Sequence, residues 1–148
     1  MNRQNRGEKM NDRKPYGQTM RGIVKKDGKI LLVKRHPKSR HNPEQWELPG
    51  GKCEKCEYFD ETLIREFKEE TGLDVELGDF YDAVQVDYPH KRTVQVIIYA
   101  DAKDFNVKIS DEHTDFKWLG KDELLEFYEK GMITPSLKKA LEKNDFEI

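Results

Sequence analysis

The pattern of apolar and polar residues predicts a β-hairpin close to the N-terminus. In MRGIVKKDGKILLVKRH, residues 20–36, apolar runs stand on both sides of Asp27-Gly28. An Asp-Gly pair between such runs is a strong signal for a tight turn between antiparallel strands. A polar loop follows at residues 37–45. The stretch WELPGG, residues 46–51, then predicts a short strand that its Pro and Gly pair bring to a sharp bend.

A second, longer hairpin is predicted in the middle of the chain. Residues 75–88 and 92–102 are rich in β-branched and aromatic residues, which favours strands, and the turn is expected around residues 89–91. Two shorter segments, VKIS (107–110) and FKWLG (116–120), predict further strands.

Three segments show the periodicity of amphipathic helices. Residues 59–71 favour a helix, because Asp60 suits its positive N-terminal end and Gly72 supplies a stop. Residues 121–132 and 135–144 predict two C-terminal helices. The residues expected to anchor these two helices in the core are Leu124, Leu125, Tyr128, Leu137 and Leu141. Strands followed by helices predict a mixed sheet with helices packed on it.

Length and charge limit the classes of protein to consider. A chain of 148 residues suits one domain, expected at residues 16–148. Residues 1–15 hold five Lys or Arg against two acids, which predicts a disordered basic tail. A net charge of -2 gives no basic footprint, so a small molecule is expected as partner rather than a nucleic acid. The longest apolar run, VIIYA at residues 96–100, is too short for a membrane helix, and the expected location is cytoplasmic.

Cys53 and Cys56 form a C-x-x-C pair. A zinc site needs four ligands, and the sequence holds no second Cys pair and no closely spaced His pair. The two residues are predicted to be structural thiols, with a redox role as the alternative.

Three glutamates fall on one side of the helix predicted at residues 59–71. Glu66 lies three and four residues before Glu69 and Glu70, and like charges at these spacings destabilise a helix by about 0.2 to 0.5 kcal/mol per pair. Arg65 lies one turn before Glu69 and can hold a carboxylate in one orientation. A hard cation such as Mg²⁺ binds carboxylate oxygens and would turn the repulsion into coordination.

The glutamates belong to a longer motif. Gly51, five residues, Glu57, seven residues and then REFKEETGL, residues 65–73, match the pattern G-x5-E-x7-R-E-U-x-E-E-x-G-U, in which U is bulky and apolar, at every specified position. This pattern is the Nudix box. The flanking stretches LLVKR, WELPGG and EHTDFKWLG are also similar to those of MutT-type Nudix hydrolases. The resemblance covers most of residues 18–130.

This resemblance implies an α/β (α+β) fold, the Nudix fold, which is an α/β/α sandwich with a mixed β-sheet. It also implies an enzyme that hydrolyses nucleoside diphosphates linked to another group, with Mg²⁺ or Mn²⁺ as cofactor. The position before the box glutamate is commonly Gly in the family and is Cys56 here. We therefore expect a local change in the turn that enters the helix.

Roles for individual residues follow from the resemblance, position by position. Glu66 matches the general base of MutT-like members and a metal ligand of others, and Arg65 matches the arginine that orients a box carboxylate. Arg35, at the end of LLVKR, is predicted to meet substrate phosphates, with a solvated strand-end charge as the alternative. The expected metal ligands are Glu69, Glu70, Glu66, the carbonyl of Gly50 and Glu112, and the expected structural positions of the box are Gly51, Glu57 and Gly72.

Several alternatives stay open. The flanks favour a nucleoside triphosphate, oxidised purine forms included, that is cleaved to the monophosphate and pyrophosphate. Pro89 and Tyr88 have spacings similar to those of ADP-ribose and dinucleoside polyphosphate hydrolases. A non-catalytic nucleotide-binding module and an RNA 5′-end pyrophosphohydrolase are the remaining candidates. The sequence does not decide between Glu66, Glu47 and Glu112 as general base, and it leaves a homodimer open.

Overall fold

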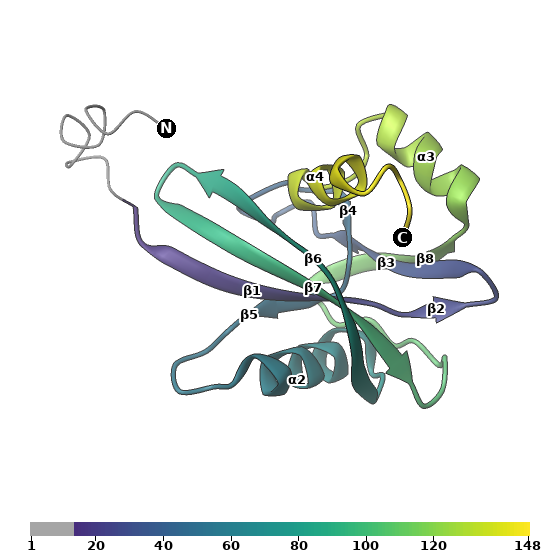
Figure 1. Ribbon diagram of the computed structural model, residues 1–148, viewed down its shortest axis with the longest axis horizontal. Coiled ribbons are helices and arrows are strands. Elements are labelled where there is room, and N and C mark those ends of the chain that lie inside the picture. Colours follow the sequence, from purple (N-terminus) through teal and green to yellow (C-terminus); the bar gives the residue numbers. More distant parts are fainter. Residues whose placement is uncertain (1–13) are drawn as a thin grey trace.

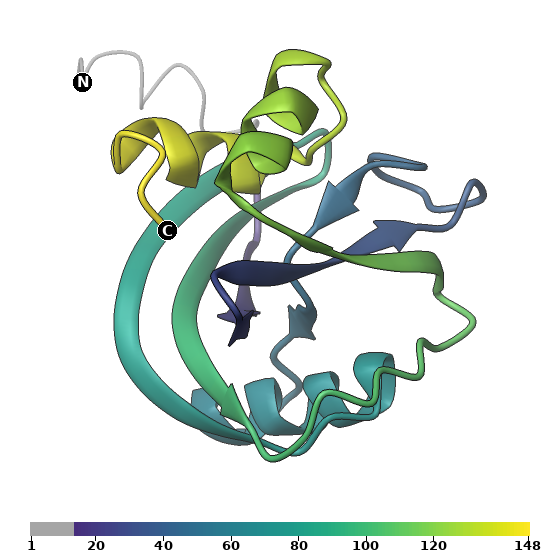
Figure 2. The ribbon, with the colours of Figure 1, turned by 90° about the vertical axis from the view of Figure 1, so that its right-hand side faces the viewer.

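The computed structural model describes residues 14–148 and places helices on both sides of the strands. Helix α2 (Phe59–Thr71) covers one side, and helices α3 (Lys121–Glu129) and α4 (Pro135–Lys143) cover the other, as Figure 2 shows. The predicted α/β/α sandwich is confirmed. Of the predicted basic tail, residues 1–13 lie outside the described residues.

The first sheet is mixed, as predicted (Figure 1). Its order is β5-β1-β7-β6, with β1 parallel to β7 and the other pairs antiparallel. The four strands are β1 (Tyr16–Ile23), β5 (Gly50–Lys52), β6 (Val75–Tyr88) and β7 (Lys91–Ala102). Strands β6 and β7 form the long hairpin that the sequence predicts.

The second sheet is antiparallel and is built around β3. Strand β8 pairs along the whole of β3, so β2 and β4 share the opposite edge. Its strands are β2 (Lys25–Lys26), β3 (Lys29–Arg35), β4 (Trp46–Glu47) and β8 (His113–Leu119). The turn from β2 to β3 has positive φ at both Asp27 and Gly28, 51° and 75°, as a tight hairpin requires. This predicted hairpin is confirmed.

One predicted strand is wrong. Residues 107–110 form no strand, because their backbone is used at the end of α2. The N–H of Lys108 donates to the carbonyl of Thr71 at 2.8 Å, and the N–H of Ser110 donates to that of Glu70 at 3.1 Å. The last carbonyls of a helix have no partner within it, so this segment satisfies them. The connection from β7 to β8 thus holds the C-terminal end of α2.

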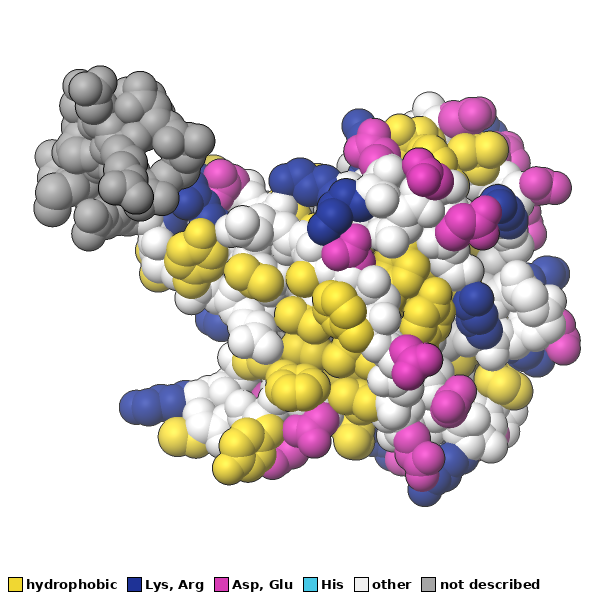
Figure 3. All heavy atoms as spheres, in the orientation of Figure 1, with side chains coloured by type: hydrophobic (Ala, Val, Ile, Leu, Met, Phe, Trp, Pro, Cys, Tyr) yellow, Lys and Arg dark blue, Asp and Glu magenta, His cyan; other side chains and the backbone are white. Residues whose placement is uncertain are grey.

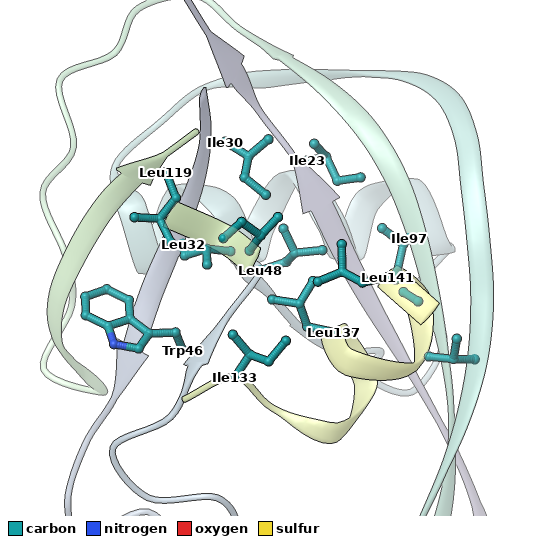
Figure 4. Packing of buried hydrophobic residues seen from close by; sticks show 13 residues of the cluster. Ile23, Ile30, Leu32, Trp46, Leu48, Ile97, Leu119, Ile133, Leu137 and Leu141 are labelled. Carbon is teal, nitrogen blue, oxygen red and sulfur yellow. The ribbon is translucent and has the colours of Figure 1, made fainter. Parts of the chain in front are cut away.

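The core consists of two clusters, one on each side of the first sheet. One lies under α4 and contains Ile23, Ile97, Leu137 and Leu141 (Figure 4). The other lies under α2, where Leu63 and Phe67 are fully buried. Residues alternate between the two faces of a strand, so β1 supplies Met20 to one cluster and Ile23 to the other. Leu124 is buried as predicted, but Leu125 is 39% exposed, and its prediction as a core anchor is wrong.

A close approach between β1 and α2 fixes the position of the helix. A Cβ added at Gly22 would overlap the ring of Phe67. The helix ends at Gly72, whose φ of 73° is left-handed and whose N–H donates to Lys68, as the sequence predicts. On the face shown in Figure 3, apolar side chains gather where β6, β7 and α2 are in view.

Candidate active site

The three glutamates of α2 differ in burial. Glu70 is buried beside Thr71, Glu66 has 14% of its side chain exposed, and Glu69 has 59% exposed. Burial follows from helical geometry, because Leu63 and Phe67 face the sheet and Glu70 lies three residues after Phe67. The three glutamates predicted on one side of the helix therefore range from the protein interior to the solvent.

Arg65 joins these carboxylates to the loop before the helix. Its Nε donates to Glu57 at 2.6 Å, and its Nη1 contacts Glu66 at 2.9 Å and Glu69 at 3.1 Å. The bonds to Glu57, the first cause, and to Glu66 raise the pKa of Arg65 above its ordinary value. Arg65 therefore meets Glu69 across one helical turn, as expected, and at the same time reaches residues outside the helix.

Glu57 acts as an anchor for the start of α2. The hydrogen bonds from Arg65, from the Thr62 hydroxyl and from the N–H of Glu54 lower its pKa to about 2. The Thr62 hydroxyl donates to Glu57 at 2.6 Å. Cys56, immediately before Glu57, has a φ of 67°, a left-handed conformation that is rare for residues other than Gly, Asn and Asp. Cys56 thus adopts a backbone conformation that favours glycine, with a cysteine side chain in its place.

The bend after β4 brings two glycines against the acidic side of α2. The N–H of Gly50 donates to Glu70 Oε2 at 2.9 Å. A Cβ at Gly50 would overlap the backbone of Met20, and a Cβ at Gly51 would overlap the carboxylate of Glu66. A side chain is therefore excluded at Gly50, and at Gly51 it would displace the Glu66 carboxylate.

The buried Glu70 and the half-buried Glu66 are poorly stabilised in their charged form. Burial raises the pKa of Glu70 to about 8; the charges of Glu47 and Glu66 add to this, while Arg21 and the Gly50 hydrogen bond oppose it. Burial also raises the pKa of Glu66, with further contributions from Glu69 and Glu112 against the opposing effect of Arg65. Negative charge at this place lacks sufficient compensation from the protein.

A cleft with a volume of about 610 Å³ opens beside these residues. Its lining combines carboxylates with cationic side chains. The acidic residues are Glu47, Glu66, Glu70, Asp111 and Glu112, and the basic ones are Arg21, Arg35, Lys38, Arg40 and Lys52. Such a cleft can hold a cation at one wall and the phosphates of a ligand at the other.

The structure brings together most of the residues that the sequence predicts for the site. Gly50, Gly51, Glu66, Glu70, Glu112 and Arg35 all line this cleft. Glu57 and Glu69 lie outside the lining and are linked to it through Arg65. Gly72 lies at the far end of α2, where its role is to end the helix.

Sequence reasoning missed a buried network that also lines the cleft. Glu47, with 4% of its side chain exposed, contacts Arg21, Arg35 and His113. Burial alone would raise the pKa of Glu47, but Arg21, the His113 hydrogen bond and Arg35 lower it to about 2. One feature of the sequence could have indicated this network. A charged residue stands within each of two short apolar stretches, Arg21 in MRGIV and Glu47 in WEL.

The oxygen donors at the acidic wall suit a hard divalent cation such as Mg²⁺. The donors are the carboxylates of Glu66 and Glu70 and the carbonyl of Gly50, and the raised pKa values of both carboxyls indicate a place where a cation would offset charge. In this structure Glu69 turns to Arg65 and Glu70 to the N–H of Gly50. Within residues 14–148 no three acidic, His or Cys side chains are gathered into a metal cluster. The donor chemistry therefore fits, and the carboxylates would have to rotate to meet around an ion.

Comparison with known proteins identifies the family. A family model described as NUDIX domain matches residues 17–142. CTP pyrophosphohydrolase of Escherichia coli (strain K12) is 33% identical over 110 residues, which cover 71% of this chain and 76% of that protein. ADP-ribose pyrophosphatase of Methanocaldococcus jannaschii is 50% identical over 54 residues, which cover 35% of this chain and 30% of that protein. The crystal structure of a MutT protein from Methanosarcina mazei Go1 is 28% identical, covers 89% of this chain and 94% of that chain, and has a TM-score of 0.81.

The family and the fold are those of hydrolases that act on the pyrophosphate bonds of nucleotides. The chain belongs to the NUDIX family. The resemblance seen in the Nudix box is thus confirmed, together with the fold that it implies. In the described part of the chain, none of the helices has the length and apolarity needed to cross a membrane.

Proposed function

We propose that this protein is a Mg²⁺- or Mn²⁺-dependent pyrophosphohydrolase that converts a nucleoside triphosphate to the monophosphate and pyrophosphate. The observation that carries the proposal is a cleft whose lining combines poorly compensated carboxylates with cationic side chains. A polyphosphate with a bound cation has the matching distribution of charge.

The cation would be held by Glu69, Glu70 and the carbonyl of Gly50, with Glu66 and Glu112 beside them. Glu69 is the most exposed of the three helix glutamates, with 59% of its side chain accessible, so it can leave Arg65 without unpacking the core. When bound, such an ion offsets charge on the pyrophosphate and lowers the pKa of a bound water. Arg65 keeps the neighbouring carboxylates in place through Glu57.

Glu66 is the proposed proton acceptor. It lines the cleft, and its raised pKa makes it a better base than an exposed glutamate. Water adds to phosphorus, its proton passes to a Glu66 oxygen, and the anhydride bond breaks to release pyrophosphate. Glu47 is a poor candidate for this task, because two arginines and His113 stabilise its charged form. Glu112 lines the same cleft and is retained as the alternative base.

Arg35 is the proposed phosphate-binding residue of the cleft. Its side chain is 24% exposed, lines the cleft and is held at the end of β3. The relatives support a triphosphate first: similarity to CTP pyrophosphohydrolase extends over 71% of the chain, and that to ADP-ribose pyrophosphatase over 35%. Hydrolysis of ADP-ribose is the second candidate, supported by the higher identity of 50% in that shorter segment.

A substrate panel with product analysis tests the proposal. We expect Mg²⁺-dependent release of pyrophosphate and a monophosphate from a nucleoside triphosphate, ordinary or oxidised. AMP and ribose phosphate from ADP-ribose would favour the second candidate. No turnover of triphosphates, ADP-ribose, dinucleoside polyphosphates or capped RNA with Mg²⁺ or Mn²⁺ would contradict the function.

Two substitutions test the metal assignment. Glu69→Gln and Glu70→Gln should each lower Mg²⁺-dependent kcat/KM at least ~100-fold. Glu70→Gln should keep the fold, because burial already disfavours the charge of Glu70. Asp82→Asn is a matched control: Asp82 pairs with Lys143 and Asn144 next to α4, outside the cleft, and its activity should be unchanged. Wild-type rates in both glutamine variants would contradict the assignment.

A further inference from the structure

We propose that Glu47 is a positioning residue that fixes the guanidinium of Arg35 on the wall of the cleft, so that one side of it stays available for a substrate phosphate. This inference rests on the proposed function, because it concerns how the phosphate is held. It assigns a role to a buried carboxylate that none of the proposed chemical steps uses.

The first observation is the way in which Arg35 is bound. Arg35 Nη1 donates to both oxygens of Glu47 at 3.1 Å, and its Nε donates to the carbonyl of His41 at 2.9 Å. Arg35 Nη2 has no hydrogen-bond partner within residues 14–148. A guanidinium carries five N–H donors in a rigid plane, so these contacts fix the plane and leave the two N–H groups of Nη2. Because Arg35 lines the cleft, they are the donors that remain for a phosphate oxygen.

The second observation is the contrast between the two arginines of Glu47. Arg21 Nη2 lies 3.4 Å from Glu47. Its Nη1 donates to the carbonyls of Leu48 and Gly50 at 3.2 and 3.4 Å, and its Nε donates to Gln95 at 3.2 Å. Arg21 is therefore held by hydrogen bonds at Nε and Nη1, and its Nη2 is paired with Glu47. In Arg35 the Nη1 group takes the pairing with Glu47, so Nη2 is the group left without a hydrogen bond among the described residues.

The third observation is the support behind Glu47. His113 Nε2 lies 3.1 Å from Glu47 Oε2, and only 3% of the His113 side chain is exposed. Strand β8 shifts register against β3: Lys34 pairs with Asp115, but Arg35 pairs with His113, so Thr114 is an extra residue. Such a bulge turns the following side chains to the opposite face. It places His113 on the same side of the sheet as Arg35, where it can brace Glu47.

Glu47 thus connects both sheets at the base of the cleft. Arg21 comes from β1 in the first sheet, and Arg35 and His113 come from β3 and β8 in the second. A charge-assisted hydrogen bond to a planar guanidinium also fixes its orientation. Loss of the Glu47 charge should therefore release Arg35 from its orientation and weaken phosphate binding, while the reacting groups on α2 stay in place.

Steady-state kinetics of Glu47→Gln, Arg35→Ala and the double variant test the proposal. We expect Glu47→Gln to raise KM for the triphosphate about tenfold with kcat within about threefold of wild type, the sign of lost binding rather than lost chemistry. In the Arg35→Ala background the same substitution should change KM by less than about twofold, because the residue through which it acts is absent. Asp82→Asn is the control for an acid-to-amide change outside the cleft.

A second variant keeps the test valid where Glu47→Gln does not fold. Arg35→Lys retains the positive charge beside Glu47 but loses the planar guanidinium with its fixed set of N–H donors. It should therefore raise KM about as much as Arg35→Ala. A wild-type KM for Arg35→Lys overturns the proposal. So do equal effects of Glu47→Gln with and without Arg35, which would show a purely structural role.

Failure of the proposed function can be told apart from failure of this inference. Calorimetry with inorganic pyrophosphate, in the absence of added metal, measures anion binding without turnover. We expect weaker pyrophosphate binding by Glu47→Gln than by wild type, and no further loss when Arg35→Ala is added. Equal affinity of wild type and Glu47→Gln for pyrophosphate overturns the positioning role whatever the enzyme hydrolyses.

Discussion

Two glutamate–arginine networks, one joined to the cleft through Glu66 and one in its lining, differ in where their members come from. In the first, Glu57 and Arg65 join the loop before α2 to the helix itself. In the second, Glu47 lies between Arg21 and Arg35, which belong to different sheets. Both carboxyls have a pKa of about 2, but direct hydrogen bonds achieve this for Glu57, whereas for Glu47 the charges around it must first overcome burial.

The first network therefore orders the start of one helix, whereas the second joins the two sheets. The first network is partly open to water, with Glu57 12% and Arg65 25% exposed, and solvent can replace a lost partner. Glu47 is 4% and Arg21 12% exposed, so removal of the Glu47 carboxylate leaves Arg21 without its counter-charge where little water reaches, whereas Arg35, 24% exposed, stays open to the cleft. We therefore expect the second network to govern stability and the first to govern the geometry of the helix carboxylates.

The largest expected effect is that of Glu47→Ala. Breaking a buried ion pair by removing one partner costs about 3–5 kcal/mol, because a charge stays buried without compensation. Urea unfolding followed by circular dichroism should show this loss, and Glu57→Ala, the matched change in the partly exposed network, should show a smaller one. Equal losses of stability in the two variants would show that the two networks contribute equally to the free energy of unfolding.

Acid should weaken the buried network in a defined window. The folded-state pKa of Glu47, about 2, is below its ordinary value of 4.5, so its contribution is complete above pH 4.5 and disappears as the pH falls through 2. The shift corresponds to an order of magnitude of about 3 kcal/mol. Stability curves of wild type and Glu47→Gln should therefore converge between pH 4.5 and 2. Parallel curves over this window would show that Glu47 does not titrate as proposed.

The same difference explains what could be predicted from the sequence. Arg65 lies one helical turn before Glu69, so helical spacing was enough to expect that pair, and the resemblance to the Nudix box gave Glu57 a structural role; the bond between Arg65 and Glu57 was not expected. The second network joins residues 21, 35, 47 and 113 through two sheets and a bulge at Thr114, and no local pattern encodes such a meeting. The strand predicted at residues 107–110 is wrong for a similar reason. The N–H groups of Lys108 and Ser110 donate to carbonyls at the end of α2, and no local pattern indicates this contact.

A smaller effect is expected where the first network meets the cleft. In Gly51→Ala the new Cβ would overlap the Glu66 carboxylate, which is the flexible end of a side chain. Glu66 should move away from Arg65, so kcat should fall about tenfold while the free energy of unfolding changes by less than about 1 kcal/mol. Gly22→Ala is the contrasting control, because its Cβ meets the packed ring of Phe67 and should lower stability. An unchanged kcat in Gly51→Ala would show that turnover does not depend on the position of the Glu66 carboxylate.

The smallest expected effect concerns the turn that carries Glu57. Cys56 has a φ of 67°, and a left-handed conformation costs a residue with a Cβ about 1–2 kcal/mol. Glycine removes this strain but loses about 0.5–1 kcal/mol through the greater freedom of the unfolded chain. Cys56→Gly should therefore stabilise the protein by about 0.5 kcal/mol, measured by urea unfolding under reducing conditions. Gly131→Ala is the converse control, because Gly131 has a φ of 68° with open space around it, and there alanine should destabilise. A loss of stability in Cys56→Gly would mean that the cysteine side chain itself holds the turn, and that the first network depends on more than Glu57 and Arg65.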